Sequence, residues 1–114
     1  MDDNRARELL AAQRAEAESL LASVDRSGRE NREAEDEEAA DYADSAQPLT
    51  EQGMDDALAE SLRIRLAAVG RAEERLAAGT YGRSVRSGEP IPDARLEADP
   101  AAELTVEEAA AQPR

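Results

Sequence analysis

Four side chains near the C-terminal end of the chain stand at the spacing of a small metal-binding knuckle. Ser84 and Ser87 form an S-x-x-S pair between two glycine turns, and Thr105 and Glu108 form a T-x-x-E pair eighteen residues after Ser87. With cysteine at these four positions, the segment would read C-x2-C-x17-C-x2-C, a strong zinc pattern. The chain has no Cys and no His, so these knuckle positions keep the spacing without a thiolate or imidazole ligand.

Other chemistry at the knuckle positions finds little support in the sequence. Ser84 and Ser87 are interpreted as turn formers, because the chain has no His or Lys that could activate a serine nucleophile. Glu107 and Glu108 are interpreted as a helix cap and dipole partners, and Thr105 with Glu108 matches a capping box. We therefore expect no catalytic residue, no metal and no cofactor, and we expect that the protein is not an enzyme.

A second group of chemically suggestive residues lies in the stretch "DYADSA", where Asp41, Asp44 and Ala46 follow a D-x-x-D-x-A pattern. Aspartate is common in solvated turns, so this pattern alone is weak in a chain with 27 acidic residues. The functional interpretation is an acidic tip that enters a tight, cation-lined site, for which Ala46 is small enough.

Composition limits what can position these groups. More than half of the hydrophobic residues are alanine and only 2% of the chain is aromatic, so a large globular core is not expected. The net charge of −13 disfavours direct binding to nucleic acid or to an anionic membrane surface and favours a basic partner. An acidic, alanine-rich chain is also compatible with partial disorder.

Hydrophobic periodicity predicts two long helices, from residue 4 to about 38 and from about 50 to 78, joined by a turn at 39–49. Each carries an apolar seam with the 4-3-4-3-4 spacing of a coiled coil. Gly79 is expected to end the second helix in a left-handed C-cap. Residues 1–79 should therefore form an antiparallel helical hairpin. Arg65 falls on the seam of the second helix, but its side chain should extend outward. The other seam positions are Ala6, Leu10, Gln13, Ala17, Leu20, Val24, Leu58, Leu62, Val69, Ala72 and Leu76.

Residues 80–114 are predicted to form a small lobe with prolines in its loops and a short helix at "VEEAAA". Its sizeable apolar side chains are Tyr81, Val85, Ile91, Leu96 and Leu104. The predicted fold class is all-α: a long antiparallel coiled-coil hairpin, a small zinc-finger-like lobe without metal, and a short C-terminal helix.

The segment "GTYGRSVRSGEPIPDARLEADPAAELTVEE" resembles the zinc lobe of the DksA/TraR family of bacterial RNA polymerase-binding regulators. The similarity extends over roughly residues 5 to 110, and Ser84, Ser87, Thr105 and Glu108 stand at the family's four zinc-binding cysteines. The D-x-x-D-x-A pattern is the family's other mark. This resemblance implies that the coiled-coil tip, with Asp41, Asp44 and Ala46, reaches through the polymerase secondary channel toward the active site and changes the stability of promoter open complexes.

The departures from the family pattern carry their own expectations. In the family the zinc is structural, so a lobe without it should be held by weaker interactions. It should also pack against the base of the helices, the end of the hairpin remote from the turn. The basic residues with which some members bind an alarmone nucleotide are replaced by Ala68, Asp99 and Ala109, in line with no cofactor. We expect the protein to be a monomer. We expect it to be in the cytoplasm, because no signal peptide or membrane-spanning run is recognised.

Two alternatives remain open at this point. One is an acidic coiled-coil adaptor protein unrelated to RNA polymerase. The other is a secondary-channel factor that carries a metal on its tip carboxylates and promotes transcript cleavage.

Overall fold

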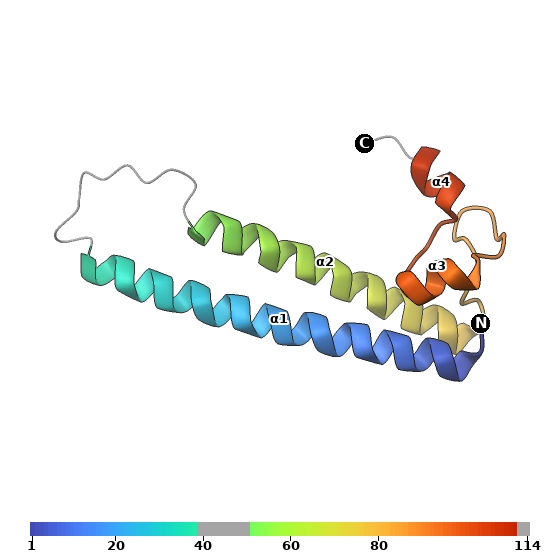
Figure 1. Ribbon diagram of the computed structural model, residues 1–114, viewed down its shortest axis with the longest axis horizontal. Coiled ribbons are helices and arrows are strands. Elements are labelled where there is room, and N and C mark those ends of the chain that lie inside the picture. The colour runs from blue at the N-terminus through green and yellow to red at the C-terminus, as the bar shows by residue number, and fades with distance from the viewer. Residues whose placement is uncertain (39–50, 112–114) are drawn as a thin grey trace. The chain divides into compact units, whose positions relative to one another are not determined.

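The computed structural model describes residues 1–38 and 51–111, with side chains for residues 1–27 and 53–111. The described residues form the helices α1 (Asp3–Glu38), α2 (Glu51–Ala78), α3 (Asp93–Ala98) and α4 (Val106–Ala111) (Figure 1). They contain no strand, only an isolated bridge between Arg83 and Pro90. The all-α prediction is confirmed, as is the short helix at "VEEAAA", whereas α3 was not predicted.

The chain divides into two units, each containing part of α1 and part of α2. The first unit is Met1–Glu16 with Leu66–Arg114, and the second is Ala17–Arg65. Within each unit the two helical segments lie side by side and antiparallel (Figure 1). The continuous coiled-coil hairpin over 1–79 and the separate lobe over 80–114 stay predictions. None of the helices in the described ranges has the length and apolarity that crossing a membrane requires.

The buried face of the long helices follows the predicted seam only in part. Ala6, Leu10, Ala17, Leu62, Val69 and Ala72 are buried as expected. Leu20 and Leu58 are not, with 44% and 49% of their surfaces exposed, so their assignment to the seam was wrong. Ala59 is buried in place of Leu58, because Ala59 lies three residues before the buried Leu62 and therefore shares its face of α2.

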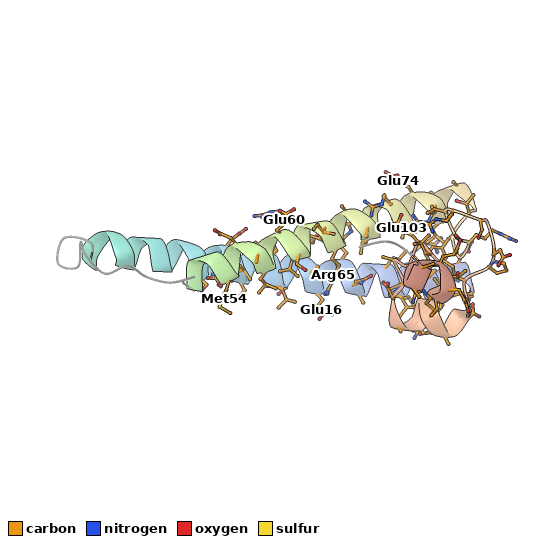
Figure 2. The ribbon with its side chains drawn as sticks, turned by 90° about the horizontal axis from the view of Figure 1, so that it is seen from above. Glu16, Met54, Glu60, Arg65, Glu74 and Glu103 are labelled. Atoms are coloured by element: carbon orange, nitrogen blue, oxygen red, sulfur yellow. The ribbon has the colours of Figure 1, made fainter. Side chains whose placement is uncertain are left out.

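The second unit is thinly packed. Ala59 and Leu62 are buried, and Arg63 of α2 forms an ion pair with Asp25 of α1 at 3.6 Å. Met54 is 68% exposed, and it projects from the side of α2 opposite to Glu60 (Figure 2). Arg65 is exposed, as its outward orientation predicted.

The first unit contains two small apolar clusters, one of which joins the lobe, residues 80–111, to both long helices. In one cluster, Ala101 of the lobe packs with Leu10 of α1 and with Val69 and Ala72 of α2. The other brings together Ile91, Leu96 and Ala102, with Met1 and Tyr81 against them. The expectation that the lobe packs against the base of the helices is confirmed, although Val85 is 56% exposed and belongs to neither cluster.

The chain leaves α2 through the predicted left-handed glycine. Gly79 has φ +78°, its N–H donates to the carbonyl of Leu76 at 3.3 Å, and the N–H of Thr80 donates to the carbonyl of Arg75 at 2.9 Å. This pair of bonds is a Schellman motif, which satisfies carbonyls that the helix end leaves free. It sets the direction in which the lobe begins.

Candidate functional site

The first pair of knuckle positions lies in a tight turn between two glycines with positive φ. Gly82 and Gly88 have φ of +87° and +77°, a conformation in which a side chain would be strained. Inside the turn, the Oγ of Ser84 accepts the backbone N–H groups of Arg86 and Ser87 at 3.1 and 3.2 Å. The prediction that Ser84 and Ser87 form a turn is confirmed.

The second pair opens α4 through a reciprocal cap. The N–H of Glu108 donates to the Oγ1 of Thr105 at 3.2 Å, and the N–H of Thr105 donates to the Oε1 of Glu108 at 3.0 Å. This arrangement is the capping box that the T-x-x-E spacing predicted. Thr105 is buried by this arrangement, with only 8% of its surface exposed.

The two pairs meet at the carboxylate of Glu108. Ser84, which is 4% exposed, donates its hydroxyl to the Oε2 of Glu108 at 3.0 Å. The N–H of Thr105, the hydroxyl of Ser84 and further hydroxyl contacts from Thr105 and Ser87 lower the pKa of Glu108 from 4.5 to about 2, despite its partial desolvation. The other three knuckle positions therefore contribute to keeping the carboxylate of Glu108 ionised.

The knuckle positions do not fit the zinc that the family resemblance implies. Their donors are three hydroxyl oxygens and one carboxylate, whereas structural zinc sites use Cys and His ligands. The oxygens are also committed, since Ser84 accepts two backbone N–H groups and Ser87 accepts that of Glu89 at 3.3 Å. Within the described parts of the chain, no group of three or more His, Cys, Asp or Glu residues could hold a metal ion.

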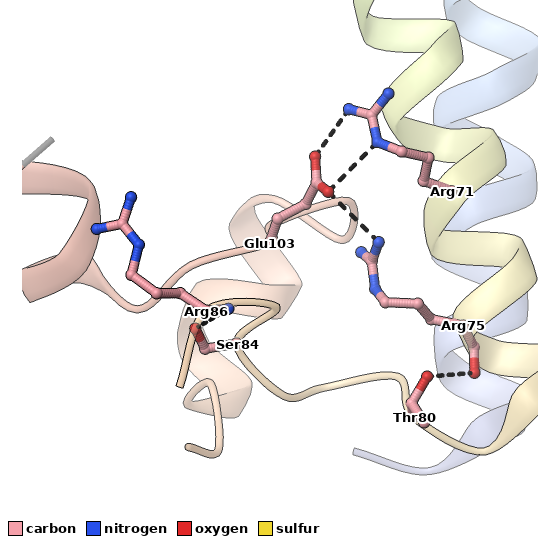
Figure 3. A network of polar contacts seen from close by, with 6 residues as sticks. All are labelled: Arg71, Arg75, Thr80, Ser84, Arg86 and Glu103. Atoms are coloured by element: carbon pink, nitrogen blue, oxygen red, sulfur yellow. Dashed lines mark hydrogen bonds and ion pairs between the residues drawn. The ribbon is translucent and has the colours of Figure 1, made fainter. Parts of the chain in front are cut away.

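Glu103 connects this part of the lobe to α2. Its backbone carbonyl accepts the N–H of Val85 at 2.9 Å, directly beside Ser84. Its carboxylate lies between two guanidinium groups (Figure 3), with Arg71 bidentate at 2.8 and 3.3 Å and Arg75 at 3.6 Å. The hydrogen bond from Arg71 lowers the pKa of Glu103 and raises that of Arg71.

Further contacts hold the lobe against the start of α1. The terminal amino group of Met1 pairs with Asp93 at 2.9 Å, and Arg5 pairs with Glu97 at 2.8 Å. The Tyr81 hydroxyl donates to the carbonyl of Pro100 at 2.7 Å, and burial raises its pKa. The lobe is therefore fixed on both long helices within the first unit.

The sequence-predicted site residues are thus only partly located. Ser84, Ser87, Thr105 and Glu108 come together, whereas Asp41, Asp44 and Ala46 lie outside the described residues. Glu103 and its partners Arg71 and Arg75 were not predicted from the sequence. A signal existed, because Arg71 and Arg75 are four residues apart and so occupy one face of α2.

Comparison with known proteins identifies two curated relatives at the same level of similarity. Both are described as RNA polymerase-binding transcription factor DksA, from Caulobacter vibrioides strain NA1000 / CB15N and from strain ATCC 19089 / CIP 103742 / CB 15. Each is 35% identical over 96 residues, covering 79% of this chain and 68% of the relative. No family model and no solved structure matches the chain.

Proposed function

The chain belongs to the DksA family, and from this premise we propose that it binds RNA polymerase and regulates transcription. The observation that carries the proposal is the 35% identity over 96 residues with relatives described as RNA polymerase-binding. The net charge of −13 supports a partner with a basic surface.

We further propose that the protein acts through the segment between α1 and α2, whose tip enters the polymerase secondary channel. The two helices flanking that segment have 36 and 28 residues, which at ~1.5 Å per residue gives lengths of roughly 54 and 42 Å. Asp41 and Asp44 would then lie near the catalytic Mg²⁺ and its basic surroundings, with Ala46 small enough to fit beside them. Their negative charge changes the stability of promoter open complexes.

In this proposal the protein acts by binding, as a cytoplasmic monomer, and catalyses no reaction itself. It reaches DNA only through polymerase, because its 14 arginines are scattered among 27 acidic residues and form no phosphate-tracking cluster. No cofactor takes part.

The lifetime of promoter open complexes, measured with purified polymerase, tests this mechanism. The variant Asp41→Asn/Asp44→Asn/Ala46→Thr should bind polymerase with an affinity within about threefold of wild type and lose the effect on lifetime. In this proposal the long helices and the lobe supply most of the contacts with polymerase, so binding should be retained, whereas the effect needs the tip charge.

The matched control is Glu16→Gln/Glu74→Gln, which removes two exposed carboxylates from the long helices. This variant should keep the full effect on open-complex lifetime. An unchanged effect in the tip variant would refute the tip mechanism, and absence of polymerase binding by the wild type would favour an unrelated acidic adaptor. Shortened transcripts in stalled complexes would instead favour a cleavage-promoting factor.

A further inference from the structure

The lobe joins two segments that are distant in sequence through a single carboxylate. Glu108 Oε2 accepts the hydroxyl of Ser84, 24 residues earlier, while Oε1 accepts the N–H of Thr105. Each carboxylate oxygen thus contacts a different half of the knuckle. A metal ion bound by the family's four cysteines would join the same two halves.

We propose that the Glu108 carboxylate replaces the family's metal ion as the cross-link of the lobe, so that the lobe closes without zinc and without thiols. The negative charge at this point is the feature that matters, because charge-assisted hydrogen bonds are about twice as strong as those between neutral groups. The hydroxyl of Ser84 is oriented toward this charge. Its lone pairs accept the N–H groups of Arg86 and Ser87, so its proton is donated to Glu108.

The cross-link also supports the attachment of the lobe to α2. The residue after Ser84, Val85, donates its N–H to the carbonyl of Glu103, whose side chain binds Arg71. Loss of the Glu108 contact should therefore loosen the turn at Ser84 and weaken the neighbouring bond between Val85 and Glu103. The consequence should extend from the knuckle positions to the ion pairs on α2.

The first test is amide hydrogen exchange in the full-length protein with Glu108→Gln, which has nearly the same size but no charge. Exchange at residues 84–91 and 105–109 should become about threefold to tenfold faster, a modest factor because the carboxylate is partly exposed to water. The matched control is Glu107→Gln on the exposed neighbouring residue, which should exchange as wild type does. Equal exchange in the two variants would overturn the proposal, and a variant at Glu108 that fails to fold while the Glu107 variant folds would support it.

The second test uses the wild-type protein and needs no substitution. Metal analysis after purification should find less than about 0.1 zinc per chain, and EDTA should not shift the melting temperature. Stoichiometric zinc whose removal lowers the melting temperature would contradict the proposal directly.

A converse variant checks that the four positions are interchangeable with a metal site. Ser84→Cys/Ser87→Cys/Thr105→Cys/Glu108→Cys should bind one zinc per chain, and EDTA should then lower its melting temperature. If this variant binds no zinc, the four positions do not surround one point, and the proposal fails.

Discussion

Serine and threonine in place of cysteine change the bonds that a residue can make at the knuckle positions. A hydroxyl holds its proton at neutral pH and donates one hydrogen bond, whereas a thiolate coordinates a metal. The donors in the lobe therefore need an anion to converge on, and Glu108 is that anion. Its hydrogen bonds with Ser84 and Thr105, at 3.0 Å each, are the direct expression of this change.

The pH dependence of stability follows from the lowered pKa of Glu108. Its pKa falls from 4.5 to about 2 in the folded chain, so its contribution is fully present above about pH 4.5 and is lost as the pH falls through about 2. The difference in unfolding free energy between wild type and Glu108→Gln should be constant from pH 7 to about 4.5 and should shrink below it. Urea unfolding at a series of pH values measures this difference.

Comparison with Glu108→Gln removes the effect of the other acidic residues, which titrate in both proteins. Glu107→Gln, whose side chain is exposed, should differ little from wild type throughout. A difference for Glu108→Gln that is unchanged at pH 3, or that grows as the pH falls, would contradict the assignment.

Hydrogen bonds between residues close in sequence could be predicted, whereas those between residues far apart in sequence could not. The bond between Thr105 and Glu108 spans three residues, so the T-x-x-E pattern was sufficient to predict it. The bond between Ser84 and Glu108 spans 24 residues and depends on how the intervening loops fold. The convergence of the four positions on one carboxylate could not be predicted for that reason.

Among the helical elements, α2 has a glycine in its interior, Gly70, and another directly after its last residue, Gly79, and the two should respond oppositely to substitution. Gly79→Ala should destabilise the protein by roughly 1–2 kcal/mol, because it places a side chain at φ +78°. Gly70→Ala should stabilise it by roughly 0.5–1 kcal/mol, because Gly70 lies inside the helix and an added Cβ would meet only the Nη2 of Arg14 at 3.8 Å. Chemical denaturation measures both, and equal signs for the two would contradict the described end of α2.

The stability of the protein should depend more on Glu103, which attaches the lobe to α2, than on Glu97, which is more exposed. Glu103 pairs with Arg75, whose side chain is only 14% exposed, so Glu103→Gln leaves a mostly buried cation with a weaker partner. We expect a loss of about 1–2 kcal/mol in unfolding free energy. Glu97→Gln is the control, because its partner Arg5 is 50% exposed, and it should cost much less. Equal losses would argue against an anchoring role for Glu103.

The extent of the long helices was predictable to within about a residue or two because caps, periodicity and glycine agree there. The missed helix α3 has six residues and follows Pro92, so too few turns exist for a periodic pattern to appear. The seam errors at Leu20 and Leu58 have a different origin. Two apolar residues stand side by side at Leu20–Leu21 and at Leu58–Ala59. Only the packing of each helix decides which of the two turns inward, and Ala59 is buried whereas Leu21 is partly buried.

At the scale of the whole molecule, the first unit holds the lobe against the two long helices. The segment between α1 and α2 carries the proposed activity. The first unit combines two apolar clusters with ion pairs from both long helices. The all-α fold and the family could be predicted from the sequence, since helical periodicity and the knuckle spacing are local patterns. The docking of the tip cannot be predicted in this way, because it depends on the shape and charge of a partner.

The most direct measurement of the central claim is photo-crosslinking from the tip in a complex with purified RNA polymerase. A benzophenone amino acid replaces Asp44, and the same residue at Glu74 serves as the comparison. We predict that the probe at position 44 crosslinks to polymerase segments around the catalytic Mg²⁺, and that the probe at position 74 does not. Crosslinks from position 44 only to surfaces outside the secondary channel, or none while polymerase is bound, would contradict the account.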